Sequence, residues 1–162
     1  MKVVKMTKVE EARFAAGCFW SVELTFSQIK GVVSTSVGYS GGEVSGPTYE
    51  KVCAGSTGHA ETVKVIYNPE KVSYNKLLEI FWELHDPTQI NKQGADIGTQ
   101  YRSVIFYLNS EQKEIAEKSK KLQEKKIGKK IVTEISQAKN FYDAEEYHQQ
   151  YLKKKSLNAC PI

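Results

Sequence analysis

The sequence predicts an α+β fold, a two-layer sandwich with helices on a mixed or antiparallel sheet, as in the ferredoxin-like plait. Strand-like and helix-like segments alternate in the order βαβ, βα, βα, βα, which helices packed on one face of a sheet satisfy. The 162 residues suit a single domain spanning residues 1–162. A doubly wound nucleotide-binding fold is disfavoured, because no G-x-G-x-x-G run follows a strand and no loop ends in Gly-Lys-Ser or Gly-Lys-Thr.

The first three expected elements form a βαβ unit. Residues 13–17, which have mostly small side chains, are predicted to form a strand that leads into a helix over residues 19–29. Apolar residues recur in that segment every three or four positions, the spacing of one helical face. Residues 32–39 are then predicted to form the second strand. The helical stripe consists of Phe19, Val22, Phe26 and Ile29, and the strand face of Val33, Val37 and Tyr39.

The middle of the chain predicts a strand followed by a helix. Residues 61–67 alternate between apolar and polar side chains, and the Asn-Pro pair at residues 68–69 ends this strand. Ser73 is a suitable N-cap for a helix that runs to about His85. Its apolar residues fall on one helical face. That face consists of Tyr74, Leu77, Phe81 and Leu84.

The last third of the chain predicts two more strands, each followed by a helix. Residues 101–108 form the first of these strands, and Ser110 begins a long, lysine-rich helix. Residues 131–138 form the last strand. Asp143 followed three residues later by Glu146 resembles a capping box, which predicts a short final helix.

Composition and charge favour a soluble protein of ordinary type, without nucleic-acid or membrane partners. Hydrophobic residues make up 40% of the chain, and the formal net charge is +4. The lysine-rich run over residues 118–130 lacks interleaved aromatic residues, so we interpret it as a solvated helix face rather than a nucleic-acid patch. Residues 1–12 contain charges throughout and do not resemble a signal peptide, and no apolar run approaches a membrane span. We therefore expect a cytoplasmic location.

Two long loops and three cysteines are the first indications of function. The loops, residues 38–59 and 86–100, lack periodicity of their own, and long loops within a compact domain are usually functional. In the reducing cytoplasm, Cys18, Cys53 and Cys160 are expected to be reactive or buried thiols rather than structural disulfides. Their odd number points the same way.

Cys18 is the strongest candidate nucleophile. It lies where the first strand ends and the first helix begins, a position where backbone N–H groups and the helix dipole favour negative charge. A thiolate would be stabilised there, and the thiolate is the nucleophilic form of cysteine. The alternative is a buried cysteine that packs as a small hydrophobic residue. The spacing alone leaves both interpretations open.

Glu61 and two tyrosines could assist such a nucleophile. In an alternating strand Glu61 points to the same face as Val63 and Val65, so burial should raise the pKa of its carboxyl group and leave it able to donate a proton. The alternative is an exposed carboxylate at the end of a strand. Tyr49 and Tyr101 are phenols that can hydrogen-bond an oxyanion or a polarised S–O group, or that pack in the core.

Gly-Cys-Phe-Trp at residues 17–20 is the first of six motifs in a fixed order. Across residues 9–153 this set resembles the A-type peptide methionine sulfoxide reductases, and several motifs in order are more specific than one. The other five are Pro-Thr-Tyr-Glu-Lys-Val-Cys at 47–53, Thr-Gly-His-Ala-Glu at 57–61, His-Asp-Pro at 85–87, Gly-Thr-Gln-Tyr-Arg-Ser at 98–103 and Tyr-His-Gln-Gln-Tyr-Leu at 147–152.

The resemblance implies a function in protein repair after oxidative damage. The substrate would be the S epimer of methionine sulfoxide, free or within a protein, and neither a metal nor an organic cofactor would be required. The implied roles are Cys18 as the nucleophile, Phe19 and Trp20 as an apolar pocket for the S-methyl group, Glu61 as the proton donor, Tyr49 and Tyr101 as hydrogen-bond donors to the sulfoxide oxygen, and Asp96 as a substrate-binding residue.

The resemblance also implies how the enzyme would be regenerated. Attack by Cys18 would leave a sulfenic acid, the first step of cysteine oxidation. Cys160, in an expected mobile tail over residues 153–162, would then form a Cys18–Cys160 disulfide, and a thioredoxin-like protein would reduce it by thiol–disulfide exchange. Cys53 is expected to be buried and structural, with direct resolution of Cys18 as the alternative. We expect a monomer.

Two other function classes compete with this one. A hydrolase or acyltransferase could use Cys18, His59 and Asp96 as a Cys-His-acid arrangement, although Cys160 would then have no role. A module that binds methionine sulfoxide peptides, or senses peroxide, would not release methionine. No metal site is expected, because His59, His85 and His148 lack ligand spacing with one another or with the cysteines.

Overall fold

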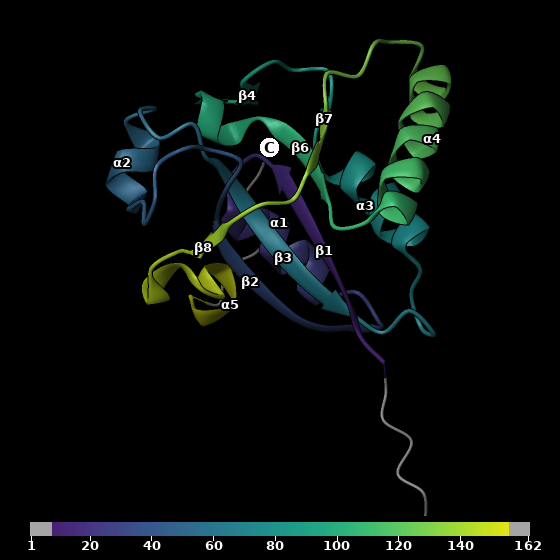
Figure 1. Cartoon of the computed structure of the whole chain (residues 1–162), viewed down its shortest axis with the longest axis horizontal. Helices are drawn as coiled ribbons and strands as arrows, with labels where there is room; N and C mark the ends of the chain where they lie inside the picture. The colour runs from purple at the N-terminus through teal and green to yellow at the C-terminus, as the bar shows by residue number, and fades with distance from the viewer. Residues whose placement is uncertain (1–7, 156–162) are drawn as a thin grey trace, which may run out of the picture.

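A computed structural model describes residues 8–155 of the chain. Six strands form one mixed sheet in the order β7-β6-β1-β3-β2-β8 (Figure 1). The strands are β1 (Glu10–Ala16), β2 (Val32–Ser40), β3 (Ala60–Tyr67), β4 (Lys92–Gln93), β5 (Asp96–Ile97), β6 (Ser103–Tyr107), β7 (Glu134–Gln137) and β8 (Phe141–Asp143). The α-helices are α1 (Phe19–Ser27), α2 (Tyr49–Cys53), α3 (Tyr74–Leu84), α4 (Ser110–Ile127) and α5 (Tyr151–Lys154), and the 3-10 helices are η1 (Thr99–Tyr101) and η2 (Glu146–His148).

The sheet topology confirms the predicted mixed sheet with helices. The four central strands run in the order β6-β1-β3-β2, and each is antiparallel to its neighbour. Helix α1 connects β1 to β2, so the chain leaves one strand between them for β3. β7 adds a parallel edge beside β6, and β8 adds an antiparallel edge beside β2. β4 and β5 form a separate two-stranded hairpin.

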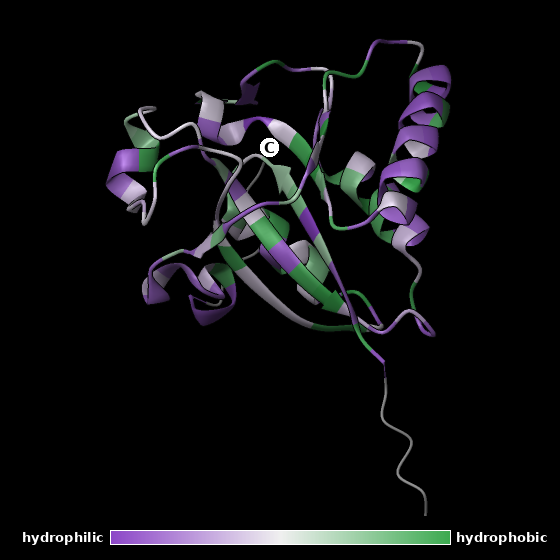
Figure 2. Ribbon diagram, in the orientation of Figure 1, coloured by the Kyte–Doolittle hydropathy of each residue, from purple (hydrophilic) through white to green (hydrophobic). Residues whose placement is uncertain are grey.

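The core lies between the sheet and helices α1 and α3. Phe14, which is fully buried on β1, stacks on Phe26 of α1 at 5.1 Å between ring centroids. It also contacts two rings of α3, Tyr74 at 6.1 Å and Phe81 at 5.3 Å. Burying each such ring stabilises the fold by about 1.5–3 kcal/mol. The resulting packing holds α1, and therefore the residues at its start, against strands in which apolar residues alternate with polar ones (Figure 2).

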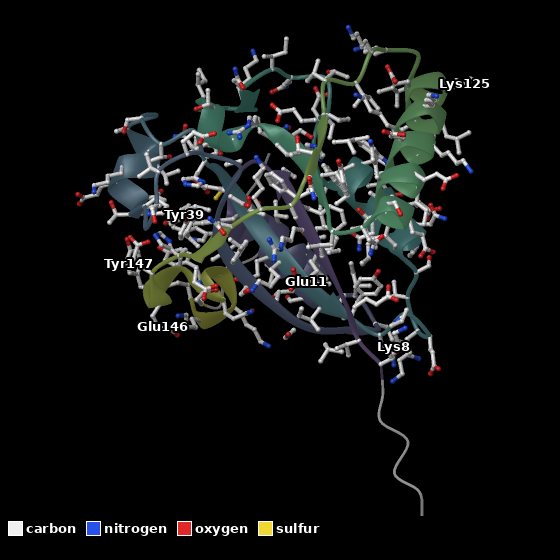
Figure 3. All side chains as sticks on the ribbon, in the orientation of Figure 1. Lys8, Glu11, Tyr39, Lys125, Glu146 and Tyr147 are labelled. Carbon is white, nitrogen blue, oxygen red and sulfur yellow. The ribbon has the colours of Figure 1, made fainter. Side chains whose placement is uncertain are left out.

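Helix α4 is the predicted surface helix and begins at Ser110 as predicted, with Asn109 as its N-cap. The Asn109 side chain accepts a hydrogen bond from the backbone N–H of Gln112 at 2.8 Å. Lys125 of this helix lies on the opposite side of the molecule from Tyr39 and Tyr147 (Figure 3). The lysine-rich face is therefore remote from α2 and α5. Between residues 8 and 155, no helix is long and apolar enough to span a bilayer.

Two details of the sequence prediction are wrong. Val33 is 61% exposed rather than on the buried face, because it is the extra residue of a β-bulge between Val32 and Ser34. Asp143 does not cap a helix, because it pairs with Gly38 as part of the edge strand β8. The final helical turns therefore begin later.

Candidate active site

Cys18 occupies the N-cap position of α1, directly after β1. It is partly exposed, and its backbone carbonyl accepts a hydrogen bond from the Ser21 hydroxyl at 3.2 Å. The unpaired N–H groups at the start of the helix favour negative charge, so this position stabilises a thiolate. The structure therefore confirms that Cys18 lies at a strand-to-helix junction.

Gly17 makes the tight turn that places Cys18. Its φ of +97° is a conformation that residues with a side chain rarely adopt. A Cβ atom there would lie 3.0 Å from the Cβ of Gln93, whose side chain is bonded to the backbone N–H and C=O of Asp86. Gln93 of the β4–β5 hairpin therefore packs directly against the turn that precedes Cys18.

We expect Gly17→Ala to lower the free energy of unfolding by about 1–3 kcal/mol, through backbone strain and the clash with Gln93. Chemical denaturation measures this loss. Gly46→Ala is the matched control, because Gly46 also has a positive φ, +58°, but no atom lies within 4 Å of its added Cβ. Equal losses in both variants would show that only backbone strain matters at Gly17.

Glu61 lies at the beginning of β3 and is 2% exposed. Its Oε1 accepts a hydrogen bond from the backbone N–H of Phe19 at 3.2 Å, which ties the carboxyl group to the residue after Cys18. Its Oε2 is buried and has no hydrogen-bond partner among residues 8–155. Burial raises the pKa of Glu61 to about 8, and the negative charge of Asp96 adds to this effect. The predicted burial is confirmed, and the group is a neutral acid at pH 7.

Tyr49 and Tyr101 both lie within electrostatic reach of Glu61. Burial raises the pKa of each phenol, and the Glu61 charge raises both further. Charge on Cys18 also raises the pKa of Tyr101, which places the two side chains in one site. Both phenols therefore keep their protons and remain hydrogen-bond donors at neutral pH.

The two residues after Cys18 belong to an aromatic wall that consists of Phe19, Trp20, Tyr49, His148 and Tyr151. Phe19 is buried and packs beside the rings of Tyr49 and His148, at 6.5 and 5.3 Å between ring centroids. Trp20 is partly exposed and stacks on Tyr151 at 4.0 Å, with the ring planes 15° apart. Its indole N–H donates to Nδ1 of His148 at 3.0 Å. This wall is apolar on the faces of its rings.

Sequence reasoning missed the contribution of the segment after β8 to this wall. Residues 147–152 were visible only as a motif of the resemblance, and His148 was considered only as a metal ligand. Glu145 was not considered, yet its carboxylate accepts hydrogen bonds from the Tyr39 hydroxyl at 2.9 Å and the Tyr49 backbone N–H at 3.1 Å. The pairing of aromatic residues with histidine in this motif was the available signal.

Three predicted site residues remain: Asp96, Cys53 and Cys160. Asp96 is exposed in the β4–β5 hairpin, and its charge acts on Glu61 and Tyr101. Cys53 is exposed, so its predicted burial is wrong: of the five residues of α2 only Val52 is buried. Cys160 lies outside the described residues.

The geometry does not favour the Cys-His-acid alternative. Both ring nitrogens of His59 are committed to the glycine-rich loop: Nδ1 accepts from the backbone N–H of Gly42 at 2.9 Å, and Nε2 lies 2.6 Å from the carbonyl oxygen of Val44. The imidazole therefore has no nitrogen left to act as a base for Cys18. Within residues 8–155, no cluster of three or more histidine, cysteine or acidic side chains could hold a metal ion.

Comparison with known proteins gives consistent matches over nearly the whole chain. A family model described as peptide methionine sulfoxide reductase matches residues 10–162. The peptide methionine sulfoxide reductase MsrA of Methanosarcina acetivorans is 58% identical over 151 residues, which cover 92% of this chain and 80% of the relative. The crystal structure of Mxr1 from Saccharomyces cerevisiae in reduced form matches with a TM-score of 0.90 and 41% identity, over 95% of this chain and 90% of that one. Mxr1 in complex with Trx2 matches with a TM-score of 0.67 and 29% identity, over 99% of this chain and 92% of that one.

Proposed function

The chain belongs to the peptide methionine sulfoxide reductase family, and we propose that it reduces the S epimer of methionine sulfoxide with Cys18 as the nucleophile and Glu61 as the proton donor. The observation that supports this assignment is the Glu61 carboxyl group, which is neutral at pH 7 and bonded to the backbone N–H next to Cys18. A sulfoxide oxygen leaves poorly unless it is protonated. A thiolate and an acid are therefore needed side by side.

In the proposed first step, the Cys18 thiolate attacks the sulfoxide sulfur while Glu61 gives its proton to the sulfoxide oxygen. Tyr49 and Tyr101 donate hydrogen bonds to that oxygen. This attack forms a bond between the Cys18 sulfur and the substrate sulfur. The protonated oxygen then passes as a hydroxyl group to the Cys18 sulfur while the S–O bond and the new S–S bond break, so that methionine leaves as a thioether and Cys18 becomes a sulfenic acid. The substrate sulfur gains two electrons, and the Cys18 sulfur loses two.

The S-methyl group of the substrate is proposed to lie against Phe19 and Trp20, and Asp96 is proposed to hold the polar part of the substrate. Trp20 is partly exposed, which leaves its ring available to the substrate, whereas Phe19 is buried, so Trp20 provides the larger part of the proposed contact surface. Asp96 is exposed at the edge of the same site. Shape and apolar surface around the reacting sulfur would provide the preference for one epimer.

Regeneration is proposed to use Cys160 and a thioredoxin-like reductant. The Cys160 thiol condenses with the Cys18 sulfenic acid, a disulfide forms and water leaves; a dithiol then reduces the disulfide by exchange. Cys160 is five positions after Lys155, the last described residue, a stretch of chain that spans at most about 18 Å. Helix α5, which ends at Lys154, begins with the Tyr151 ring stacked on Trp20. Mxr1, the yeast relative, has been solved with Trx2.

Three further assignments, of domain extent, cellular location and fold type, accompany this function. We place residues 1–162 in one catalytic domain with a C-terminal tail, and the protein in the cytoplasm, where its thiols would be kept reduced. We also assign the central four strands to the ferredoxin-like plait. The order β6-β1-β3-β2, with α1 and α3 as the two connecting helices, supports that assignment.

The test is one incubation of the fully reduced protein with excess methionine S-sulfoxide and no reductant. About one methionine per chain should form while two thiols disappear together, joined as Cys18–Cys160. Intact thiols and no methionine would refute the reductase assignment. Methionine R-sulfoxide is the matched control, and equal reduction of both epimers would refute the proposed specificity.

Cys160→Ser should still form about one methionine per chain in this incubation, because the first step needs only Cys18. The variant should then stall as a sulfenic acid, and thioredoxin should not restore multiple turnovers. Mass spectrometry after trapping of the sulfenic acid measures the stalled form. Full multiple-turnover activity of Cys160→Ser with thioredoxin would remove the resolving role.

A further inference from the structure

We propose that Glu23 is a positioning residue for the substrate pocket: its carboxylate anchors the chain at Gln150 and thereby holds His148 and Tyr151 against Trp20. The inference rests on the proposed role of Trp20 as a pocket wall. Glu23 itself is buried on α1, one turn after Phe19, and does not touch the reacting atoms.

Glu23 is a buried carboxylate held by hydrogen bonds rather than by an ion pair. It is 1% exposed, and none of the ion pairs found between residues 8 and 155 involves it. Oε1 accepts from the backbone N–H of Gln150 at 2.8 Å, and Oε2 accepts from Gln150 Nε2 at 2.9 Å and Thr35 Oγ1 at 3.0 Å. A buried acid is costly unless such donors surround it. Its presence on the face of α1 that meets the C-terminal segment therefore needs a specific explanation.

Gln150 has a backbone conformation that requires such an anchor. Its φ of +54° is left-handed, and among the described residues only Asn91 is another non-glycine residue with a positive φ. This conformation is sparsely populated unless the surroundings impose it. Both ends of Glu23's carboxylate bind Gln150, so the helix that bears the nucleophile determines the direction of the chain at this turn.

The turn at Gln150 separates the two side chains that orient Trp20. His148, two residues earlier, accepts the indole N–H at 3.0 Å, and Tyr151, one residue later, stacks on the ring at 4.0 Å. The preceding Gln149 side chain is bonded to the backbone N–H and C=O of Val37 in β2, at 2.9 and 2.8 Å. Two consecutive glutamines thus bind this segment to the sheet and to α1. Loss of either anchor should leave the indole free to change its orientation.

Glu23→Gln should raise KM for a methionine sulfoxide peptide about fivefold to tenfold and change kcat less than about twofold, because binding surface rather than acid or nucleophile is disturbed. The amide preserves the shape of the side chain, but its NH₂ group would replace Oε2, which accepts hydrogen bonds from Gln150 Nε2 and Thr35 Oγ1. Donors would then face donors. The Trp20 indole N–H signal in a ¹⁵N NMR spectrum should shift. Trp82, bonded to Ser119 at 2.8 Å on the α3–α4 side, is the internal reference. Glu117→Gln, at an exposed position on α4, is the matched control.

The exchanged pair Glu23→Gln with Gln150→Glu is the rescue variant. It restores one donor amide and one acceptor carboxylate, and the Thr35 hydroxyl can reverse its roles as donor and acceptor. Recovery of both KM and the indole signal supports the anchor. Should Glu23→Gln fail to fold, Thr35→Val, which removes one donor to the same carboxylate, must raise KM and shift the Trp20 signal in the same direction.

Wild-type KM together with an unshifted Trp20 signal in Glu23→Gln would overturn the inference, as would a shift of Trp82 equal to that of Trp20. These outcomes are separable from failure of the proposed function. If the wild-type chain reduces no sulfoxide, the proposed function fails, whereas the indole signal still reports whether Glu23 orients Trp20. If the wild-type chain is active and Glu23→Gln behaves like Glu117→Gln, only the anchor fails.

Discussion

Glu61→Gln should lower kcat/KM for methionine sulfoxide by about a thousandfold, because the amide cannot give a proton to the departing oxygen. The substitution preserves the shape of the side chain and the acceptor for the Phe19 N–H. Steady-state kinetics with thioredoxin measure the loss. Glu70→Gln, at an exposed position near the end of the same strand, is the matched control and should be unaffected.

The same variant should be more stable than the wild type at neutral pH. The pKa of Glu61 is about 8 in the folded chain and near the ordinary 4.5 in the unfolded chain, so unfolding releases a proton between these values. The stability of the wild type therefore falls as pH rises from about 4.5 to about 8. Glutamine does not ionise, so Glu61→Gln should gain about 1–3 kcal/mol at pH 7.5 and little at pH 4.5. Denaturant unfolding at both pH values measures this.

The pH profile connects the two effects. Wild-type activity should fall as pH rises through about 8, because Glu61 then loses the proton that it donates. The small residual activity of Glu61→Gln should lack that decline. A variant that is inactive and also destabilised at pH 7.5 would show that Glu61 is a structural carboxylate, not a buried acid.

Local patterns predicted the position of Cys18 and the burial of Glu61, and the structure confirms both placements. The junction between a strand and a helix at Cys18 follows from adjacent residues, and the face of Glu61 follows from the alternation of Val63 and Val65. The error at Val33 arose because a β-bulge depends on the partner strand, which alternation alone does not reveal. The exposure of Cys53 likewise depends on how little of α2 the core can cover.

The rest of the site depends on contacts between residues far apart in the chain. Trp20 and His148 are 128 positions apart, and Glu23 and Gln150 are 127 apart. No periodicity links such pairs, and only the completed sheet brings residues 144–151 back over α1. The same limit applies to α2, which Glu145 binds from a distance of 96 residues. The position of Cys18 is predictable from adjacent residues, whereas the aromatic residues around it are brought together only in the folded chain.

Cys18→Ser should reduce methionine formation to the background of the incubation, because a hydroxyl at this helix start remains protonated and is a far weaker nucleophile than a thiolate. The expected loss is at least about 10⁴-fold in kcat. The fold should be retained, since the substitution exchanges sulfur for oxygen at a partly exposed position. Neither thioredoxin nor a small dithiol should restore activity, because both act after the first step.

Cys53→Ser is the control for Cys18→Ser, because it removes a different thiol near the same site. Cys53 is exposed at the end of α2 and hydrogen-bonds the Tyr49 phenol, and serine retains a polar partner for it. We expect its turnover with thioredoxin to stay within about twofold of the wild type. If Cys53→Ser instead stalls after one methionine while Cys160→Ser turns over, Cys53 resolves Cys18 directly. Methionine formed by Cys18→Ser would move the nucleophile away from the start of α1, and the neutral Glu61 carboxyl would then have no thiolate beside it to assist.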